Sequence, residues 1–291
     1  MTPVPLHPLL EELALQGRFA AGGVRTLVPG LVDAGSWSTD RRSRAVYDAT
    51  PFEHVGGPDD VEGFERGMSP LARRVLASAP AEALVLEIGS GPGHVTGLLR
   101  RRGVRVVALD QSVESLRRVR RRTDAPAVVA DCRRLPFADG TFDLVLADGV
   151  LHHSSRPRDA FQEAVRVLAP GGALFVRMYR GEGRYPSIHR TVGGLLRAAH
   201  ADSALRPLVW KVFAPIYRRA ADARDRRAGR PAARHDAGVF ADYFLTPHAT
   251  PVRGASLLAW LRAERLDVLA YEAWGNVHGM LARRRGGGRP G

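Results

Sequence analysis

The chain has 291 residues, of which 45% are hydrophobic and 25% charged, a composition typical of a folded globular protein and not of a disordered one. Its one cysteine, Cys132, excludes an internal disulfide and a thiolate zinc site, so we predict a reducing, cytoplasmic location and no bound metal. The formal net charge is +13, but Lys211 is the only lysine and arginine supplies the rest. We interpret this arginine excess as a solvated surface that reflects a GC-rich coding sequence, with nucleic-acid binding as the weaker alternative.

The chain shows no signal-peptide pattern at its start and no run approaching the roughly 18 apolar residues that a membrane-spanning helix needs. Shifts in hydrophobic period divide it into five segments. These are an N-terminal helical or lid segment (1–80), an alternating strand and helix core (81–180), a helical insertion (181–250), a C-terminal helix with two strands (251–285) and a disordered tail (286–291).

Within the first segment, apolar residues recur at helical spacing over residues 6–15 and 61–79, which predicts a helix in each place. Residues 33–60 between them are predicted to be irregular. This stretch carries four aromatic or imidazole side chains, which either fold over a site or pack on the core: Trp37, Tyr47, Phe52 and His54.

From residue 83, short apolar runs alternate with helical patterns, which is typical of parallel β-α-β units. The predicted strands are 84–88, 105–109, 127–130, 142–147 and 173–178, and the predicted helices are 96–102, 112–121 and 157–168. The alternation lapses after residue 180, where helices are predicted at 188–199 and 208–223. It returns with a helix at 254–265 and strands at 267–274 and 276–284, so the block between is interpreted as an insertion into a doubly wound sheet.

A glycine-rich turn follows the first predicted core strand, where residues 85–93 read VLEIGSGPG. Glycines let the backbone approach a ligand closely, and the helix that follows offers unpaired N–H groups at its N-terminus. Because His94 replaces the third glycine of G-x-G-x-x-G, a nicotinamide or flavin dinucleotide is disfavoured. Asp110 ends the next strand, where a carboxylate accepts hydrogen bonds from two ribose hydroxyls. These features predict a nucleotide-like cofactor.

Further motifs follow the glycine-rich turn in order: Asp110, residues 131–132 (DC), 135–143 (LPFADGTFD), 150–153 (VLHH) and 168–172 (LAPGG). Together they resemble class I S-adenosylmethionine-dependent methyltransferases, most closely the ubiquinone and menaquinone biosynthesis type. The match runs from about residue 83 to 178. The resemblance implies an α/β fold with a Rossmann-like doubly wound sheet of seven strands, the last antiparallel, and S-adenosylmethionine as cofactor.

Carried over by position, the resemblance also implies which residues bind the cofactor. Glu87 would lie near the methionine amino group, Asp110 would bind the ribose, and Asp131 would accept from the adenine amino group. Cys132 would flank the adenine ring. The remaining expected cofactor-binding residues are Gly89, Ser90, Gly91, Gly93 and Gln111.

Candidate catalytic residues follow the fourth core strand, at the sheet edge where ligands bind in open α/β folds. His152 and His153 can act as a general base, because imidazole titrates near neutrality, or can hold the cofactor site structurally. By the resemblance, Asp148 would face the methyl group. Candidate substrate-binding residues in or beside the insertion are Tyr179, Phe240 and Tyr243, and His235 and His248 are weaker candidates.

The sequence therefore predicts an enzyme that transfers a methyl group to an O, C or N atom of a small organic acceptor, such as a secondary metabolite or quinone. An RNA methyltransferase of the tRNA wobble-uridine type is the first alternative, with the arginines of residues 218–234 as a phosphate-binding segment. A catalytically silent cofactor-binding scaffold is the second. The sequence leaves the acceptor and the oligomeric state open.

Overall fold

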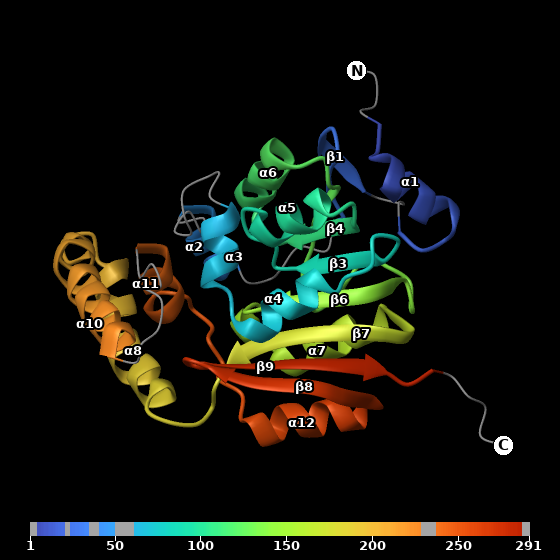
Figure 1. Cartoon of the computed structure of the whole chain (residues 1–291). Helices are drawn as coiled ribbons and strands as arrows, with labels where there is room; N and C mark the ends of the chain where they lie inside the picture. The colour runs from blue at the N-terminus through green and yellow to red at the C-terminus, as the bar shows by residue number, and fades with distance from the viewer. Residues whose placement is uncertain (1–4, 21–23, 35–40, 50–60, 228–236, 287–291) are drawn as a thin grey trace.

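The computed structural model describes residues 5–20, 24–34, 41–49, 61–227 and 237–286. A Rossmann-like mixed sheet of nine strands runs through them in the order β1-β2-β5-β4-β3-β6-β7-β9-β8 (Figure 1). Alternate strand residues point to opposite faces of the sheet, so Leu84 and Leu86 pack in one apolar cluster while Val85 packs in another. Helices cover both faces, which is the doubly wound arrangement predicted from the alternating pattern.

The seven strands that the sequence predicts are all present in the described residues. They are β3 (Leu84–Ile88), β4 (Arg105–Asp110), β5 (Ala127–Val129), β6 (Phe142–Asp148), β7 (Leu168–Tyr179), β8 (Leu266–Trp274) and β9 (Val277–Arg284). Strands β3 to β7 are parallel, and β9 runs antiparallel to β7.

The predicted strand number is wrong, because the N-terminal segment adds β1 (Arg25–Val28) and β2 (Leu31–Asp33) to the sheet edge. Strand β2 pairs in parallel with β5, and all three of its residues are buried. The two strands form a hairpin whose turn uses Gly30 at a φ of 74°. The first segment is thus not purely helical, because the run TLVPGLVD forms this hairpin at the edge of the sheet.

Two helix boundaries also differ from prediction. The helix expected over 61–79 is broken into α3 (Val61–Gly67) and α4 (Pro70–Ala77), because the Ser69 side chain accepts from the N–H of Ala72 and caps a new helix that starts with proline. Helix α7 (Pro157–Arg166) stops short of its predicted end at residue 168, where β7 already begins, so the Pro-Gly-Gly run belongs to the strand.

The other helices of the described core lie close to their predicted positions. They are α1 (Pro8–Leu15), α5 (His94–Arg101), α6 (Val113–Arg122), α7 (Pro157–Arg166) and α12 (Gly254–Ala263). Helix α2 (Arg41–Ala49) lies in the stretch predicted to be irregular, and Trp37, Phe52 and His54 lie outside the described residues. Asp48 of α2 accepts a 2.6 Å hydrogen bond from Ser112, so α2 is tied to the start of α6.

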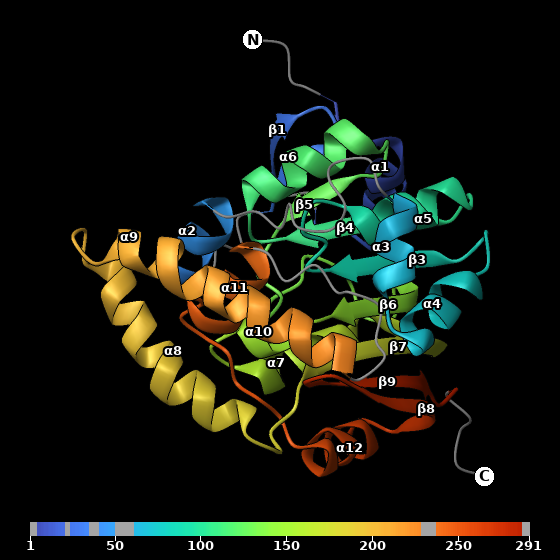
Figure 2. The same ribbon diagram turned by 60° about the vertical axis from the view of Figure 1, so that its left-hand side comes forward.

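The insertion between β7 and α12 is helical, as predicted. It contains α8 (Tyr185–Ala201), α9 (Arg206–Leu208), a π-helical turn (Val209–Phe213), α10 (Ala214–Arg227) and α11 (Ala237–Phe244). These helices share a small core of their own, in which Leu196, Val209 and Phe240 are buried. Helices α8 and α10 lie on the outside of the insertion, and α11 lies between them and the sheet (Figures 1 and 2).

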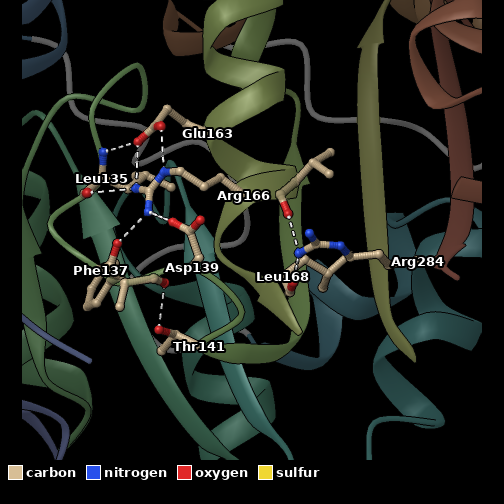
Figure 3. A network of polar contacts seen from close by, with 10 residues as sticks. Leu135, Phe137, Asp139, Thr141, Glu163, Arg166, Leu168 and Arg284 are labelled. Carbon is tan, nitrogen blue, oxygen red and sulfur yellow. Dashed lines mark hydrogen bonds and ion pairs between the residues drawn. The ribbon is translucent and has the colours of Figure 1, made fainter. Parts of the chain in front are cut away.

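The LPFADGTFD loop is held to α7 by one guanidinium group (Figure 3). Arg166 donates to the carbonyls of Leu135 and Phe137 and to the carboxylates of Glu163 and Asp139, over 2.7 to 3.1 Å. Glu163 in turn accepts from the N–H of Leu135 at 2.7 Å. The Glu163 hydrogen bond raises the pKa of Arg166. This loop motif therefore fixes the backbone that leads into β6.

Candidate active site

A cavity of about 480 Å³ lies at the carboxyl ends of β3, β4, β6 and β7. Figure 1 shows these strand ends pointing toward the insertion. Segments far apart in the chain line the cavity, among them α2, α3, the glycine-rich turn, the ends of β4 and β5, the β6–β7 region, the insertion and the β8–β9 turn. Its position is the one at which open α/β sheets bind ligands.

The glycine-rich turn brings its backbone to the cavity wall. Gly89 has a φ of 71°, and a Cβ built on it would lie 2.4 Å from Cγ2 of Val150, so this position requires glycine. Gly89, Ser90 and Gly91 all line the cavity. Gly93, expected with them, does not: its φ of 89° ends the turn, and a Cβ there would lie 2.9 Å from Cγ2 of Val119 in α6.

Asp110 and Gln111 lie on the cavity wall at the end of β4. The Asp110 carboxylate accepts from the N–H groups of Gly91 and Ser112, both at 2.9 Å, so it is fixed against the glycine-rich turn. Burial raises the pKa of Asp110. The arrangement places a fixed carboxylate beside exposed backbone, which is what recognition of a ribose requires.

Glu87 is a buried carboxylate at the end of β3 and lines the same part of the cavity. It accepts a hydrogen bond from the hydroxyl of Thr96 in α5. Burial raises the pKa of Glu87 to about 8. A carboxyl group in such surroundings favours a cationic partner, because a nearby positive charge stabilises the ionised form.

Asp131 and Cys132 form the wall next to Asp110. Both carboxylate oxygens of Asp131 accept from Arg133, the shorter contact being 2.6 Å, so Asp131 is already paired with a cation. Burial raises the pKa of Cys132 to about 12, which keeps the thiol neutral. Cys132 therefore serves as an apolar wall and not as a nucleophile.

The two neighbouring histidines occupy different environments. His152 is fully buried beneath Tyr179, with ring centroids 4.0 Å apart, and does not line the cavity. Burial and the neighbouring His153 lower the pKa of His152 well below its usual range. His152 therefore lies outside the cavity lining, with its ring packed against Tyr179.

His153 lines the cavity and faces an acceptor with each ring nitrogen. Nδ1 lies 3.0 Å from the carbonyl oxygen of His248, and Nε2 lies 3.1 Å from Oδ1 of Asp242. Burial opposes charge on the ring, but the Asp242 carboxylate and the hydrogen bond with the His248 carbonyl together outweigh it and raise the pKa of His153. The geometry matches an imidazolium held by a carboxylate, which is not a free base.

Asp242 is the centre of a polar cluster that sequence reasoning missed. Besides His153, it accepts hydrogen bonds from the hydroxyl of Tyr47 at 3.3 Å and from the hydroxyl of Tyr179. These groups come from α2, the turn after β6, the end of β7 and α11, and all line the cavity. The available signal was one acidic residue in the otherwise apolar run VFADYF.

Asp148, expected to face a methyl group, forms an ion pair with Arg177 of β7. Both side chains line the cavity. Sequence reasoning did not identify Arg177, because its pairing depends on the register of β6 against β7, which places Asp148 opposite it.

Of the three expected substrate-binding residues, Tyr179 and Tyr243 line the cavity and their rings lie 5.2 Å apart. Phe240 does not line it. Phe240 is 1% exposed and packs against Trp210 and Phe244, because it lies on the face of α11 that points into the insertion core. This corrects the expectation for Phe240. His235 lies outside the described residues.

Comparison with known proteins agrees with this geometry. Residues 86–176 match the family described as Methyltransferase domain. Demethylmenaquinone methyltransferase of Beutenbergia cavernae is 36% identical over 46% of this chain and 60% of its own length. Malonyl-(acyl-carrier protein) O-methyltransferase of Enterobacter lignolyticus is 39% identical over 35% of this chain and 42% of its own. The chain spans between 24% and 62% of the length of the first curated relatives that it matches.

Solved structures support the fold. The 1,6-didemethyltoxoflavin-N1-methyltransferase of Burkholderia thailandensis, solved with its substrate and S-adenosylhomocysteine, superposes with a TM-score of 0.50. The two are 18% identical, and the match covers 85% of this chain and 91% of that one. From the motifs, the cavity and these similarities we conclude that residues 86–176 form a methyltransferase domain, which is similar to the methyltransferases of quinone biosynthesis.

Proposed function

We propose that the whole chain is a methyltransferase that moves a methyl group from S-adenosylmethionine to an O, C or N atom of a small organic acceptor. The observation that carries this proposal is a single cavity with two chemically different parts. We call the lining formed by the glycine-rich backbone, Asp110 and Glu87 the cofactor part, and the lining formed by the Asp242 cluster the acceptor part. A cavity of this volume fits a small ligand.

The residues of the first part fit the cofactor. Asp110 would bind the ribose hydroxyls, the backbone at Gly89 would approach the methionine portion, and Glu87 would face its cationic amino group. When bound, S-adenosylmethionine supplies an activated methyl group on a sulfonium, so the protein contributes alignment and exclusion of water. Because Arg133 already holds Asp131, an adenine contact to Asp131 would share a carboxylate with that guanidinium.

The second part would orient the acceptor. His153 and the hydroxyls of Tyr47 and Tyr179 fix the Asp242 carboxylate at the cavity wall. We assign Asp242 as the group that would take the proton that an acceptor O–H or acidic C–H loses on methylation, with S-adenosylhomocysteine as the leaving group. His153, held by acceptors on both nitrogens, is a positioning residue for Asp242 and not the base.

The relatives named above favour a small or carrier-bound acceptor over RNA, because their names describe a quinone precursor and a malonyl group. Within the arginine segment, Arg224 lines the cavity. Arg218, Arg219, Arg226 and Arg227 are exposed along α10 and are available for other contacts.

The test is incubation of the pure protein with methyl-labelled S-adenosylmethionine and a deproteinised cell extract, followed by separation of small molecules from RNA. Label in the small-molecule fraction is the expected result, and an Asp110→Asn variant should lose it. Label in RNA alone would replace the proposal with the RNA alternative. Cofactor binding without transfer to either fraction would favour the silent scaffold.

A further inference from the structure

The outer helices of the insertion expose an unusual amount of apolar surface. Among the described residues, thirteen large hydrophobic side chains are exposed, and eight of them lie within the 29 residues from 188 to 216. The eight are Ile188, Val192, Leu195, Leu205, Leu208, Val212, Phe213 and Ile216. Scattered exposed hydrophobic residues are ordinary, but such a concentration marks an interaction surface.

On α8, the exposed apolar residues lie on a different face from the buried ones. Ile188, Val192 and Leu195 follow the i, i+4, i+7 spacing and are 42%, 43% and 74% exposed. The buried face carries Tyr185 and Leu196, so α8 already packs against the rest of the protein through other apolar residues. The exposed stripe is therefore additional to what folding needs.

The next helical stretch repeats the pattern. Leu205, Leu208, Val212 and Ile216 follow the spacing i, i+3, i+7, i+11 through α9, the π-helical turn and α10, and each is between 40% and 56% exposed. Val209, between them, is fully buried in the insertion core. Both outer helices thus carry one buried apolar face and one exposed apolar face.

The same stretch is strongly basic. Residues 185–227 contain nine lysines and arginines against three aspartates; without Arg197 and Arg224, which face inward, and the buried Asp225, seven basic residues remain against two acidic ones. A second copy docked by the same face would bring two such excesses together, which Coulomb repulsion opposes. Exposed apolar side chains beside an excess of basic side chains instead complement an anionic lipid surface, which has acidic headgroups above an apolar interior.

We propose that the outer face of α8, α9 and α10, here called the apolar-basic face, binds the surface of a bilayer that contains anionic lipid. In the part of the chain that the structure describes, no helix is long and apolar enough to cross a bilayer, so the contact would lie in the interface plane. The inner side of the same insertion reaches the cavity through Arg224, Asp242 and Tyr243. Lipid binding is independent of the proposed methyl transfer.

The experiment is flotation of the full chain with vesicles of phosphatidylcholine, with and without phosphatidylglycerol, in the absence of cofactor. We expect binding only with phosphatidylglycerol present. Serine at Leu195, Leu205 and Ile216 together should weaken it about tenfold or more, because these side chains would enter the interface. Glutamine at Arg218, Arg219 and Arg226 should weaken it about a hundredfold at low salt.

Matched control variants distinguish binding by the apolar-basic face from non-specific binding to vesicles. Leu15→Ser removes a leucine that is 90% exposed on α1, and glutamine at Arg73, Arg74 and Arg101 removes three exposed charges from α4 and α5. Both should bind like the unmodified protein. Absence of binding to anionic vesicles, equal loss in the controls, or binding that the serine variant leaves unchanged would overturn the proposal. So would a dimer that dissociates on Leu195→Ser, since the face would then join two copies.

Discussion

The two parts of the cavity differ in how the chain builds them. The cofactor part comes from consecutive strand ends and turns between Glu87 and Cys132, so its residues are close in sequence as well as in space. The acceptor part brings together Tyr47, His153, Tyr179 and Asp242, which are up to 195 residues apart. The cofactor part is a local motif, whereas the acceptor part forms only when the insertion and α2 pack together at the edge of the sheet.

This difference explains how one fold serves different acceptors. A local motif keeps its geometry when surrounding loops change, whereas a cluster held by long-range contacts changes with every insertion. We therefore expect substitutions in the two parts to have separable effects, on cofactor affinity in the first and on turnover in the second.

The largest effect is expected for Asp242→Asn. The amide cannot take a proton or balance the charge of His153, so kcat should fall about a hundredfold to a thousandfold. The dissociation constant of S-adenosylmethionine, measured by calorimetry, should stay within about twofold, because Asp242 lies in the acceptor part. The control is Asp222→Asn, because Asp222 lies in α10 of the same insertion but does not line the cavity. A loss of cofactor affinity in Asp242→Asn as large as its loss of kcat would contradict the separation of the two parts of the cavity.

Asp110→Asn should give the next largest effect, now on the cofactor. The variant keeps the size of the side chain but loses the charge that two ribose hydroxyls would use, so cofactor affinity should fall about thirtyfold to a hundredfold. Calorimetry measures it directly. The matched control is Asp124→Asn, whose side chain is 70% exposed and paired with Arg100 outside the cavity. Unchanged cofactor affinity in Asp110→Asn would show that Asp110 does not bind the ribose.

A smaller, pH-dependent effect is expected at Glu87. The pKa of Glu87 is about 8 in the folded protein and 4.5 in the unfolded chain. Protonation of Glu87 therefore stabilises the folded protein without cofactor; this stabilisation is complete below pH 4.5 and is lost as the pH rises through 8. A cationic cofactor would lower that pKa and release a proton. Cofactor affinity should therefore rise about fivefold between roughly pH 7 and 8.

Glu87→Gln provides the comparison for that pH profile. Calorimetry in buffers of different ionisation enthalpy should detect proton release in the unmodified protein and none from this site in the variant. A pH-independent affinity in the unmodified protein would show that Glu87 does not face the cationic group of the cofactor.

The smallest effect on the site is expected for Arg166→Gln, which lies outside the cavity lining. Loss of its contacts to Leu135, Phe137 and Glu163 should cost about 2 kcal/mol of folding free energy, because several partners lose a charged donor together. Asp139→Ala, at an 80% exposed side chain, should cost less than about 1 kcal/mol. Urea unfolding measures both. A drop in kcat in Arg166→Gln without loss of stability would contradict its structural role.

The sequence predicts the strands and turns that carry the cofactor part because each of these features is local. Short continuous apolar runs predict β3 and β4, and the glycines and Asp110 follow these strands directly. It was insufficient for β1 and β2, whose hairpin gains its burial only by pairing with β5. The helical pattern of residues 239–244 also did not show that Asp242 faces the cavity while Phe240 faces the insertion core.

His152 and His153 show the same limit of prediction from sequence. Adjacent residues of equal chemistry in the sequence differ in the structure, because a tight turn after β6 points His153 at the cavity and His152 into the core. The partners of His153, the carbonyl of His248 and the carboxylate of Asp242, come from the far end of the insertion. Such partners depend on tertiary packing, which no local pattern records.

The most direct test of the account is calorimetric titration of S-adenosylmethionine into the unmodified protein, Asp110→Asn and Asp242→Asn. The account predicts that the unmodified protein and Asp242→Asn bind alike and that Asp110→Asn binds weakly, since the two carboxylates lie in different parts of one cavity. Normal binding by Asp110→Asn, or loss of binding in Asp242→Asn, would contradict the division of the cavity into a cofactor part and an acceptor part.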